Sequence, residues 1–293
     1  MKRNARQKIV VALDTDDPRR ALSLVAQLRS EVGAFKFGKE FMSGTLRRII
    51  SLPKQEAFEC VGALRALFNE LDGNVFWDGK FNDIPNTVSK ATGEIAALGV
   101  KMLNVHCTGG EEMMREAALV AKRMSNANGK KRPLVLGVTL LTSLSYQDLV
   151  KMGLAPDVRT PGNQNVEKEK QKIGRERIVQ TLALLAKDCG LDGVVASAKE
   201  APIIRRACGE EFKIVTPAIR PEWALPNDQN KDRITTPTQA IRAGADMLVI
   251  GRPITNPPPG IGSPIEAARS IQAEIEFALG ERRGQEEKIT LAD

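Results

Sequence analysis

Three charged residues lie close together after an apolar run in the first third of the chain. Asp78, Lys80 and Asp83 follow Val75-Phe76-Trp77, which has the composition of a buried strand. On an extended chain the side chains of Asp78 and Lys80 leave the same face, because they are two residues apart. A carboxylate beside an ammonium can stabilise charge and move a proton, although a surface ion pair is the simpler interpretation of this spacing alone.

Eight short apolar runs, separated by helical segments, predict the elements that position these charges. Most runs are continuous rather than alternating, as expected for parallel strands covered on both faces. After the charged segment, Ile84-Pro85 ends the strand and Asn86 is expected to cap a helix. Asp17-Pro18, Thr236-Pro237 and Ser263-Pro264-Ile265-Glu266 are further helix-start signals. The eight runs are Ile9-Leu13, Ala34-Gly38, Val75-Trp77, Met102-Val105, Leu134-Val138, Gly193-Ala196, Lys213-Thr216 and Met247-Ile250.

Eight strand–helix units predict an α/β protein with the (β/α)8 barrel fold in a single domain. A doubly wound open sheet is the alternative, but no Gly-x-Gly-x-x-Gly motif follows the first strand. The spacing of the strands predicts surface insertions after strands two and five. The first insertion is expected to add helix around residues 56–71, and residues 156–174 are expected to form a mobile surface insertion. Residues 1–280 are thus the predicted barrel domain, and residues 281–293 a frayed tail.

Active sites in such barrels form at the carboxyl ends of the strands. Lys36 lies within an apolar strand, where a buried ammonium needs carboxylate partners, and Asp14 and Asp78 on the neighbouring strands are the candidates. The alternative is that the side chain of Lys36 is not buried and extends out of the barrel mouth into water. Further polar residues at strand ends are Thr142 after strand five, Arg220 after strand seven and Gly251-Arg252 after strand eight.

The ends of strands seven and eight have the composition of a phosphate site. Gly251 permits close backbone approach, and Arg252 offers a fork of donors to a phosphate group. The loop that begins at Arg220 contains Gln229 and two prolines, as expected for a lid that closes on a ligand. The alternative is that Arg252 is a surface residue at a helix start and Gln229 an ordinary loop residue.

Composition and charge argue against several classes of protein. The chain has 293 residues, of which 42% are hydrophobic, so it can bury a full core. Its net charge of +7 can attract nucleic acid, a membrane or a small anionic substrate. The dense basic run Lys130-Lys131-Arg132 is short and lacks aromatic neighbours for base stacking, so no nucleic-acid partner is predicted. No apolar stretch approaches the roughly 20 residues of a membrane span, so no membrane partner is predicted.

Cysteine and histidine usage argues against disulfides and against histidine-based sites. The four cysteines form no Cys-x-x-Cys pair, which indicates free thiols in a reducing compartment, and we expect a cytoplasmic protein. His106 is the only histidine, so neither a histidine-based metal site nor a histidine triad is expected. We interpret His106 as a structural residue at the end of strand four.

A set of motifs follows the predicted strands in order. They are Val-Ala-Leu-Asp14, Phe-Lys36-Phe-Gly, Asp78-x-Lys80-x-x-Asp83-Ile-Pro-Asn-Thr87, Asn-Val-His106-x-x-Gly-Gly, Leu-Thr142-Ser, Thr-Pro-Ala-Ile-Arg220, Asp-Gln229 and Ile-Gly251-Arg252-Pro-Ile-Thr. Together they resemble the orotidine 5′-monophosphate decarboxylase family, across most of the chain outside the two insertions. Two positions depart from the usual pattern: Gly79 stands where a larger apolar residue is common, and Ala218 where glycine is usual.

The resemblance implies a carboxy-lyase that converts orotidine 5′-monophosphate (OMP) to UMP and CO₂ in pyrimidine biosynthesis, without metal or organic cofactor. It implies that Lys80 protonates pyrimidine C6 within an array of Lys36, Asp78, Lys80 and Asp83. It further implies a homodimer with a shared active site, to which the partner contributes Asp83. The implied substrate-binding residues are Asp14 and Lys36 for the ribose, Thr87 of the partner and Ile84 nearby, Thr142 for the pyrimidine, and Arg220, Gln229, Gly251 and Arg252 for the phosphate.

Two other functions are compatible with parts of the same pattern. A magnesium-dependent sugar-phosphate decarboxylase or synthase of the same superfamily shares the Asp-x-Lys-x-x-Asp strand end. The Ile-Pro-Asn-Thr continuation, Leu-Thr-Ser and Asp-Gln favour the OMP decarboxylase over it. A non-catalytic nucleotide-binding barrel is the third hypothesis, and it is disfavoured because every charged position of the motifs is present.

Overall fold

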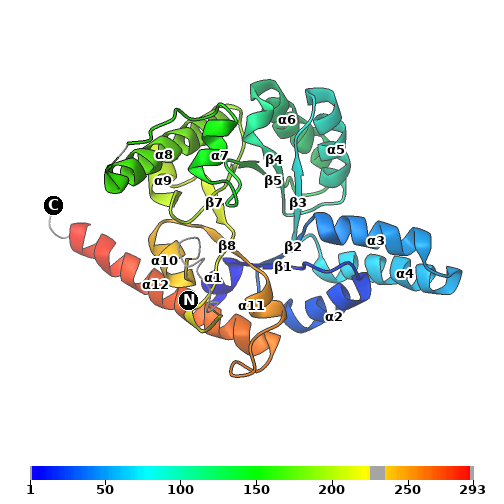
Figure 1. Cartoon of the computed structure of the whole chain (residues 1–293). Coiled ribbons are helices and arrows are strands. Elements are labelled where there is room, and N and C mark those ends of the chain that lie inside the picture. Colours follow the sequence, from blue (N-terminus) through cyan, green and yellow to red (C-terminus); the bar gives the residue numbers. More distant parts are fainter. Residues whose placement is uncertain (1, 161, 225–234, 291–293) are drawn as a thin grey trace.

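The computed structural model describes residues 2–160, 162–224 and 235–290. Eight parallel strands pair in sequence order, and β8 pairs with β1, so the sheet is a closed barrel (Figure 1). The predicted (β/α)8 fold is therefore confirmed. The strands are β1 (Ile9–Ala12), β2 (Ala34–Phe37), β3 (Val75–Phe81), β4 (Met102–His106), β5 (Leu134–Val138), β6 (Gly193–Val195), β7 (Lys213–Thr216) and β8 (Met247–Ile250).

The helices surround the barrel and cover the outer face of its sheet (Figure 1). They are α1 (Lys2–Gln7), α2 (Pro18–Leu28), α3 (Lys39–Ser51), α4 (Lys54–Leu71), α5 (Pro85–Ala97), α6 (Glu111–Ala127), α7 (Tyr146–Lys151), α8 (Gln164–Asp188), α9 (Ala201–Cys208), α10 (Pro237–Arg242), α11 (Arg252–Thr255) and α12 (Pro264–Thr290), with short 3₁₀ helices η1 (Cys107–Gly109) and η2 (Glu222–Ala224).

Helix starts follow the local signals in most places. Asp17 accepts a hydrogen bond from the backbone N–H of Arg19, and Thr236 forms a capping box with Gln239. Ser263 and Glu266 exchange the two hydrogen bonds of the predicted box as well. The prediction for Asn86 was wrong, because α5 already begins at Pro85, whose fixed φ suits the first helical position.

Two packed layers of side chains hold the barrel together. A cluster made of strand residues, including Val10, Phe76 and Leu136, fills the barrel interior. A larger cluster, which includes Val11, Leu103 and Ile271, lies between the strands and the helices. Alternate residues of each strand thus face opposite layers, and both faces are apolar, which explains why the strand sequences are continuous apolar runs.

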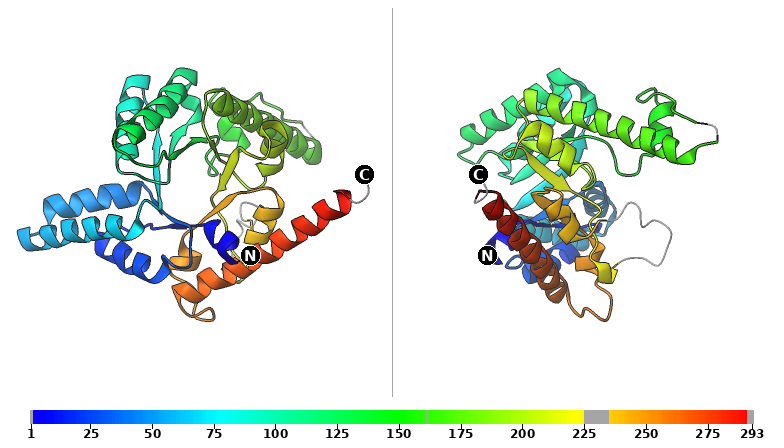
Figure 2. Two further views of the ribbon diagram at one scale, coloured as in Figure 1. Left: turned by 180° about the vertical axis from the view of Figure 1, so that it is seen from behind. Right: turned by 90° about the vertical axis from the view of Figure 1, so that its left-hand side faces the viewer.

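Helical structure extends further than the sequence indicated at two places. Helix α8 begins at Gln164, so the second half of the predicted surface insertion over residues 156–174 is helical. The Glu- and Lys-rich sequence there has high helix propensity, and Asn163 caps the helix by accepting from the N–H of Val166. Helix α12 likewise continues past residue 280 to Thr290, where a frayed tail was predicted. Figure 2 shows the amino-terminal half of α8 projecting beyond the barrel.

Candidate active site

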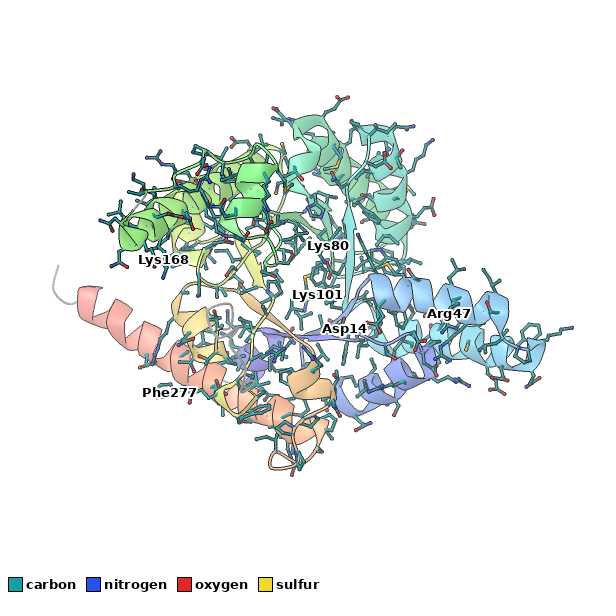
Figure 3. The ribbon with its side chains drawn as sticks, viewed as in Figure 1. Asp14, Arg47, Lys80, Lys101, Lys168 and Phe277 are labelled. Carbon is teal, nitrogen blue, oxygen red and sulfur yellow. The ribbon has the colours of Figure 1, made fainter. Side chains whose placement is uncertain are left out.

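Four charged side chains meet at the carboxyl end of strands β1 to β3. Lys36 Nζ lies 3.4 Å from Asp14 Oδ1 and 3.2 Å from Asp78 Oδ2. Lys80 Nζ lies 2.6 Å from the other oxygen of Asp78. Asp78 therefore lies between two ammonium groups. Lys36 has the two carboxylate partners that were predicted for it, because a buried ammonium without partners is costly. In Figure 3, Asp14 and Lys80 lie toward the barrel axis, whereas Arg47 lies out on α3.

A buried asparagine on β4 completes this cluster. Asn104 is fully buried; its Nδ2 donates to Asp78 Oδ1 at 2.7 Å, and its Oδ1 accepts from the backbone N–H of Lys80 at 2.8 Å. One side chain thus orients both the carboxylate and the backbone of the adjacent lysine. Asn104 was not among the predicted site residues. A lone amide within the apolar run Met102-Leu-Asn-Val-His106 was a signal for it, because a buried polar group needs partners.

The lysine is presented by an irregularity in β3, not by a regular strand. The pairing of β3 with β4 shifts register between Trp77 and Phe81, and Lys80 has φ of +48°. The predicted proximity of Asp78 and Lys80 is confirmed, but the extended backbone assumed for it was wrong. A left-handed conformation costs a non-glycine residue roughly 1–2 kcal/mol. The hydrogen bond from Lys80 N–H to Asn104 is one interaction that holds this strained backbone.

Asp78 is ionised in this environment. Its side chain is 9% exposed. Burial alone would raise the pKa of this carboxyl, but Lys36 and Lys80, with hydrogen bonds from Lys80 and Asn104, outweigh it and hold the pKa below its ordinary value. Burial also lowers the pKa of His106, as does the nearby positive charge of Lys80 and Lys39. His106 is therefore expected to be neutral at pH 7.

The charged cluster forms one wall of a cavity of about 160 Å³. Its remaining walls come from β5 to β8 and the loops that follow them, and they are mostly apolar. A polar edge facing an apolar wall suits a planar ligand with one charged side. A larger cavity of about 430 Å³ lies between α3 and α4, but it is almost wholly apolar and gathers no charged cluster. The lining of the smaller cavity is Lys36, Phe76, Asp78, Lys80, Val138, Leu140, Leu141, Thr142, Val195, Ala196, Pro217 and Val249.

The predicted phosphate residues that the structure describes, Arg220, Gly251 and Arg252, are not part of the lining of this cavity. A Cβ atom on Gly251 would lie 3.5 Å from Asp14 Oδ2, so the end of β8 adjoins the charged cluster. Arg220 is half-buried and Arg252 is exposed, and neither guanidinium has a partner in the described part of the chain. Both are therefore available to an anion. Gln229 lies outside the described residues.

Ala218, one of the two departures from the usual motif, has a backbone conformation that favours glycine. It has φ of +61°, in the left-handed region, where a side chain is disfavoured and glycine is tolerated without cost. The backbone before Arg220 thus keeps a conformation typical of glycine even though alanine stands there. This residue directly follows Pro217, which lines the cavity.

Three predicted site residues do not reach the cluster within one chain. Asp83, Ile84 and Thr87 lie exposed at the start of α5. The Oδ1 atom of Asp83 accepts from the N–H of Ile84 at 2.7 Å, and Asp83 makes no ion pair with Lys80. Ile84 is 66% exposed, which is unusual for a large apolar side chain.

The loop that carries Asp14 is held against α3 by charge and close packing. Asp16 accepts hydrogen bonds from Arg47 at 2.8 Å and from Arg48 at 3.0 Å. Gly44 of α3 lies so close that a Cβ atom there would overlap the Cβ of Asp16 and come within 2.7 Å of its Cα. A glycine at residue 44 is therefore required for this contact.

Gly44→Ala is expected to destabilise the fold by about 1–3 kcal/mol, because the loop must move away from the added methyl group. Gly62→Ala is the matched control, since Gly62 also lies within a helix but has no neighbour near its Cβ position. That control should gain roughly 0.5–1 kcal/mol from helix propensity. Urea unfolding of both variants measures the difference, and a stabilising Gly44→Ala would contradict the close packing.

Comparison with known proteins now places the chain. The family described as "Orotidine 5′-phosphate decarboxylase / HUMPS family" matches residues 7–271. This chain belongs to that family. It is 42% identical to an orotidine 5′-phosphate decarboxylase of Syntrophotalea carbinolica, over 94% of this chain and 98% of that protein. It is 41% identical to the enzyme of the same name from Syntrophomonas wolfei, over 93% and 99%.

A solved structure agrees with this placement. The orotidine 5′-phosphate decarboxylase of Lactobacillus acidophilus matches with a TM-score of 0.63 and 28% identity, over 91% of this chain and 98% of that one. The family resemblance read from the motifs is thus confirmed, and with it the assignment of the chain as an enzyme of the carboxy-lyase class. None of the described helices is long and apolar enough to cross a membrane.

Proposed function

We propose that this protein decarboxylates OMP to UMP in pyrimidine biosynthesis, in the cytoplasm and without metal or organic cofactor. The observation that supports this most is Asp78, an ionised and nearly buried carboxylate fixed between Lys36, Lys80 and Asn104. Such an arrangement provides fixed charge of both signs at the edge of an apolar cavity. The names of the relatives favour OMP over the sugar phosphates of the superfamily.

Lys80 carries the chemical step in this proposal. Loss of CO₂ leaves a carbanion at C6 with no adjacent group to accept the electron pair, so fixed charge must stabilise it. The Lys80 ammonium stabilises the developing anion and then donates a proton to C6, which produces UMP. Asp78 holds Lys80 in place and lies near the substrate carboxylate. Repulsion between two such anions about 4 Å apart is roughly 4 kcal/mol at an effective dielectric of 20, and we rank it second to carbanion stabilisation.

The rest of the site binds the nucleotide. Asp14 and Lys36 hold the ribose hydroxyls, and Thr142 contacts the pyrimidine. Arg220, Gln229, Arg252 and the backbone of Gly251 bind the phosphate, whose binding energy closes the loop after β7 and contributes to lowering the barrier. Arg220 and Arg252 follow β7 and β8, and their guanidinium groups have no partner among the described residues, which supports this division.

A second copy of the chain completes the site. Asp83, Ile84 and Thr87 are exposed and form no hydrogen bond or ion pair with their own chain's cluster, so a homodimer that brings Asp83 to the partner's Lys80 accounts for their presence. In this arrangement the charges alternate from Lys36 through Asp78 and Lys80 to Asp83 of the other subunit.

Hybrid dimers test the sharing of the site. Lys80→Ala and Asp83→Ala proteins are each expected to be inactive, but their mixture should regain up to about one quarter of wild-type activity, because a hybrid dimer contains one site with both residues intact. Mixing Lys80→Ala with Lys80→Arg protein is the control and should recover nothing. Absence of recovery after confirmed subunit exchange would refute a shared site.

The activity itself is measured by the loss of OMP absorbance as UMP forms, with excess EDTA or with added Mg²⁺. We expect equal turnover in both conditions. No turnover by folded protein, or turnover that needs Mg²⁺, would overturn the proposal in favour of a sugar-phosphate enzyme of the superfamily.

A further inference from the structure

A charged pair outside the cavity connects two of the loops that line it. Arg175 on α8 donates from Nε to Glu200 Oε1 at 2.8 Å and from Nη1 to the backbone carbonyl of Leu144 at 2.8 Å. The second oxygen of Glu200 accepts from the backbone N–H of Ser197 at 3.1 Å. Arg175 thus reaches the loop after β5 directly and the loop after β6 through Glu200.

Both loops contribute walls to the substrate cavity. Leu140, Leu141 and Thr142 line it from the β5 loop, and Val195 and Ala196 from β6 and the residue after it. The N–H of Leu144 donates to the carbonyl of Leu141 at 3.1 Å, so residues 141–144 form a turn with Thr142 and Ser143 at its centre. The guanidinium of Arg175 therefore holds the last residue of the turn that presents Thr142.

The burial and geometry of the pair make it a specific connection. The side chain of Glu200 is 5% exposed and that of Arg175 is 23% exposed, so neither is an ordinary solvated surface charge. A planar guanidinium can donate in two fixed directions at once, which a lysine ammonium on a flexible chain reproduces poorly. Arg175 does not line the substrate cavity. It lines another cavity of about 430 Å³, distinct from the one between α3 and α4, to which Thr142 also contributes.

We propose that Arg175 is a positioning residue for pyrimidine recognition, acting with Glu200 to fix the Thr142 turn and the β6 loop against the flat base. This inference rests on the proposed function. It also gives α8 a role, because this helix, which begins within the insertion, supplies the side chain that sets one wall of the site. A purely structural pair would stabilise the fold without distinguishing the base of a ligand from its sugar phosphate.

The test compares two ligands that differ only in the base. Arg175→Lys should raise the Kd for UMP about tenfold, the effect of one lost charge-assisted hydrogen bond, and change the Kd for ribose 5-phosphate by less than about twofold. Arg177→Lys is the matched control, because Arg177 is exposed on the same helix and has no partner within the described residues. That control should leave both values unchanged.

A double-mutant cycle tests the route through the turn. In a Thr142→Ala background, Arg175→Lys should weaken UMP binding by clearly less than tenfold, because one of the two groups that it positions is gone. Equal losses for UMP and ribose 5-phosphate, or a full tenfold loss in the Thr142→Ala background, would overturn the inference. Should Arg175→Lys not fold, Glu200→Gln tests the same pair and is expected to give the same selective loss.

Different results would refute the proposed function and the proposed role of Arg175. Wild-type protein that binds ribose 5-phosphate no more weakly than UMP would remove the proposed nucleotide function. Wild-type protein that binds UMP selectively, with Arg175→Lys and Glu200→Gln equally selective, would remove only the role of Arg175.

Discussion

Lys80→Ala is expected to lower kcat for OMP by about 10⁴-fold or more, because the variant loses both the cation that stabilises the carbanion and the proton donor. The ammonium of Lys80 lies 2.6 Å from Asp78, and its chain is fixed at the backbone by Asn104. Lys36, the other lysine of the cluster, is already held by Asp14 and Asp78, so it is not expected to replace Lys80. Initial-rate measurements at saturating OMP give the comparison.

Two further variants separate chemistry from folding. Lys90→Ala removes an exposed lysine from the adjoining helix α5 and should keep full activity. Lys80→Gly should be as inactive as Lys80→Ala but more stable by roughly 1 kcal/mol, because residue 80 has a left-handed φ that glycine adopts without strain. Residual activity of Lys80→Ala above about one hundredth of wild type would contradict the assigned role.

The bulged backbone and the desolvation of the buried carboxylate of β3 are both energetic costs at the site. A left-handed Lys80 costs conformational energy, and the desolvation of Asp78 is outweighed only because two lysines and Asn104 surround it. Strain and buried charge concentrated on one strand end are typical of functional sites, where the surrounding fold supplies the stability. Here the supporting fold is the closed barrel, in which β2 and β4 pair with β3 on either side.

The sequence predicted the barrel well because its strands are buried on both faces. Continuous apolar runs with helical segments between them indicate parallel strands covered on both faces, and the absence of a Gly-x-Gly-x-x-Gly motif after the first run favoured the barrel over the open sheet. The same logic found the partners of Lys36, since a cation within such a run must meet carboxylates from the neighbouring strands. The helix starts at Asp17, Thr236 and Ser263 were predictable for a local reason, because capping uses residues within one turn.

What could not be predicted depends on contacts between strands or on weak local preferences. The role of Asn104 depends on how β3 and β4 align, and that alignment includes a register shift that no local pattern indicates. Residues 164–174 of α8 carry a polar sequence with no apolar face, so periodicity could not distinguish helix from loop. The link from Arg175 to Leu144 joins residues 31 positions apart, and neither residue type signals the other.

Asp78→Asn is expected to be the second most damaging change. The amide keeps the shape but removes the negative charge between two lysines, so Lys80 is no longer held and the array of alternating charges is broken. We expect kcat/KM to fall about 10³-fold, and the fold to lose about 3–5 kcal/mol at pH 7, because one partner of a buried ion pair is gone. Steady-state kinetics and urea unfolding measure the two effects.

Asp14→Asn is the matched control for stability. Asp14 contacts the same Lys36, but its side chain is 54% exposed, so its loss should cost less than about 1 kcal/mol.

The stability that Asp78 contributes should also depend on pH. Because the folded-state pKa of Asp78 lies below the ordinary value of 3.8, its contribution to stability is present in full above that pH and is lost as pH falls through the folded pKa. The gap in unfolding free energy between wild type and Asp78→Asn should therefore stay constant from pH 7 to about pH 5 and then shrink as the solution becomes more acidic. A gap that instead widened on acidification would mean that Asp78 is protonated in the folded protein, and its place between the two lysines would need another explanation.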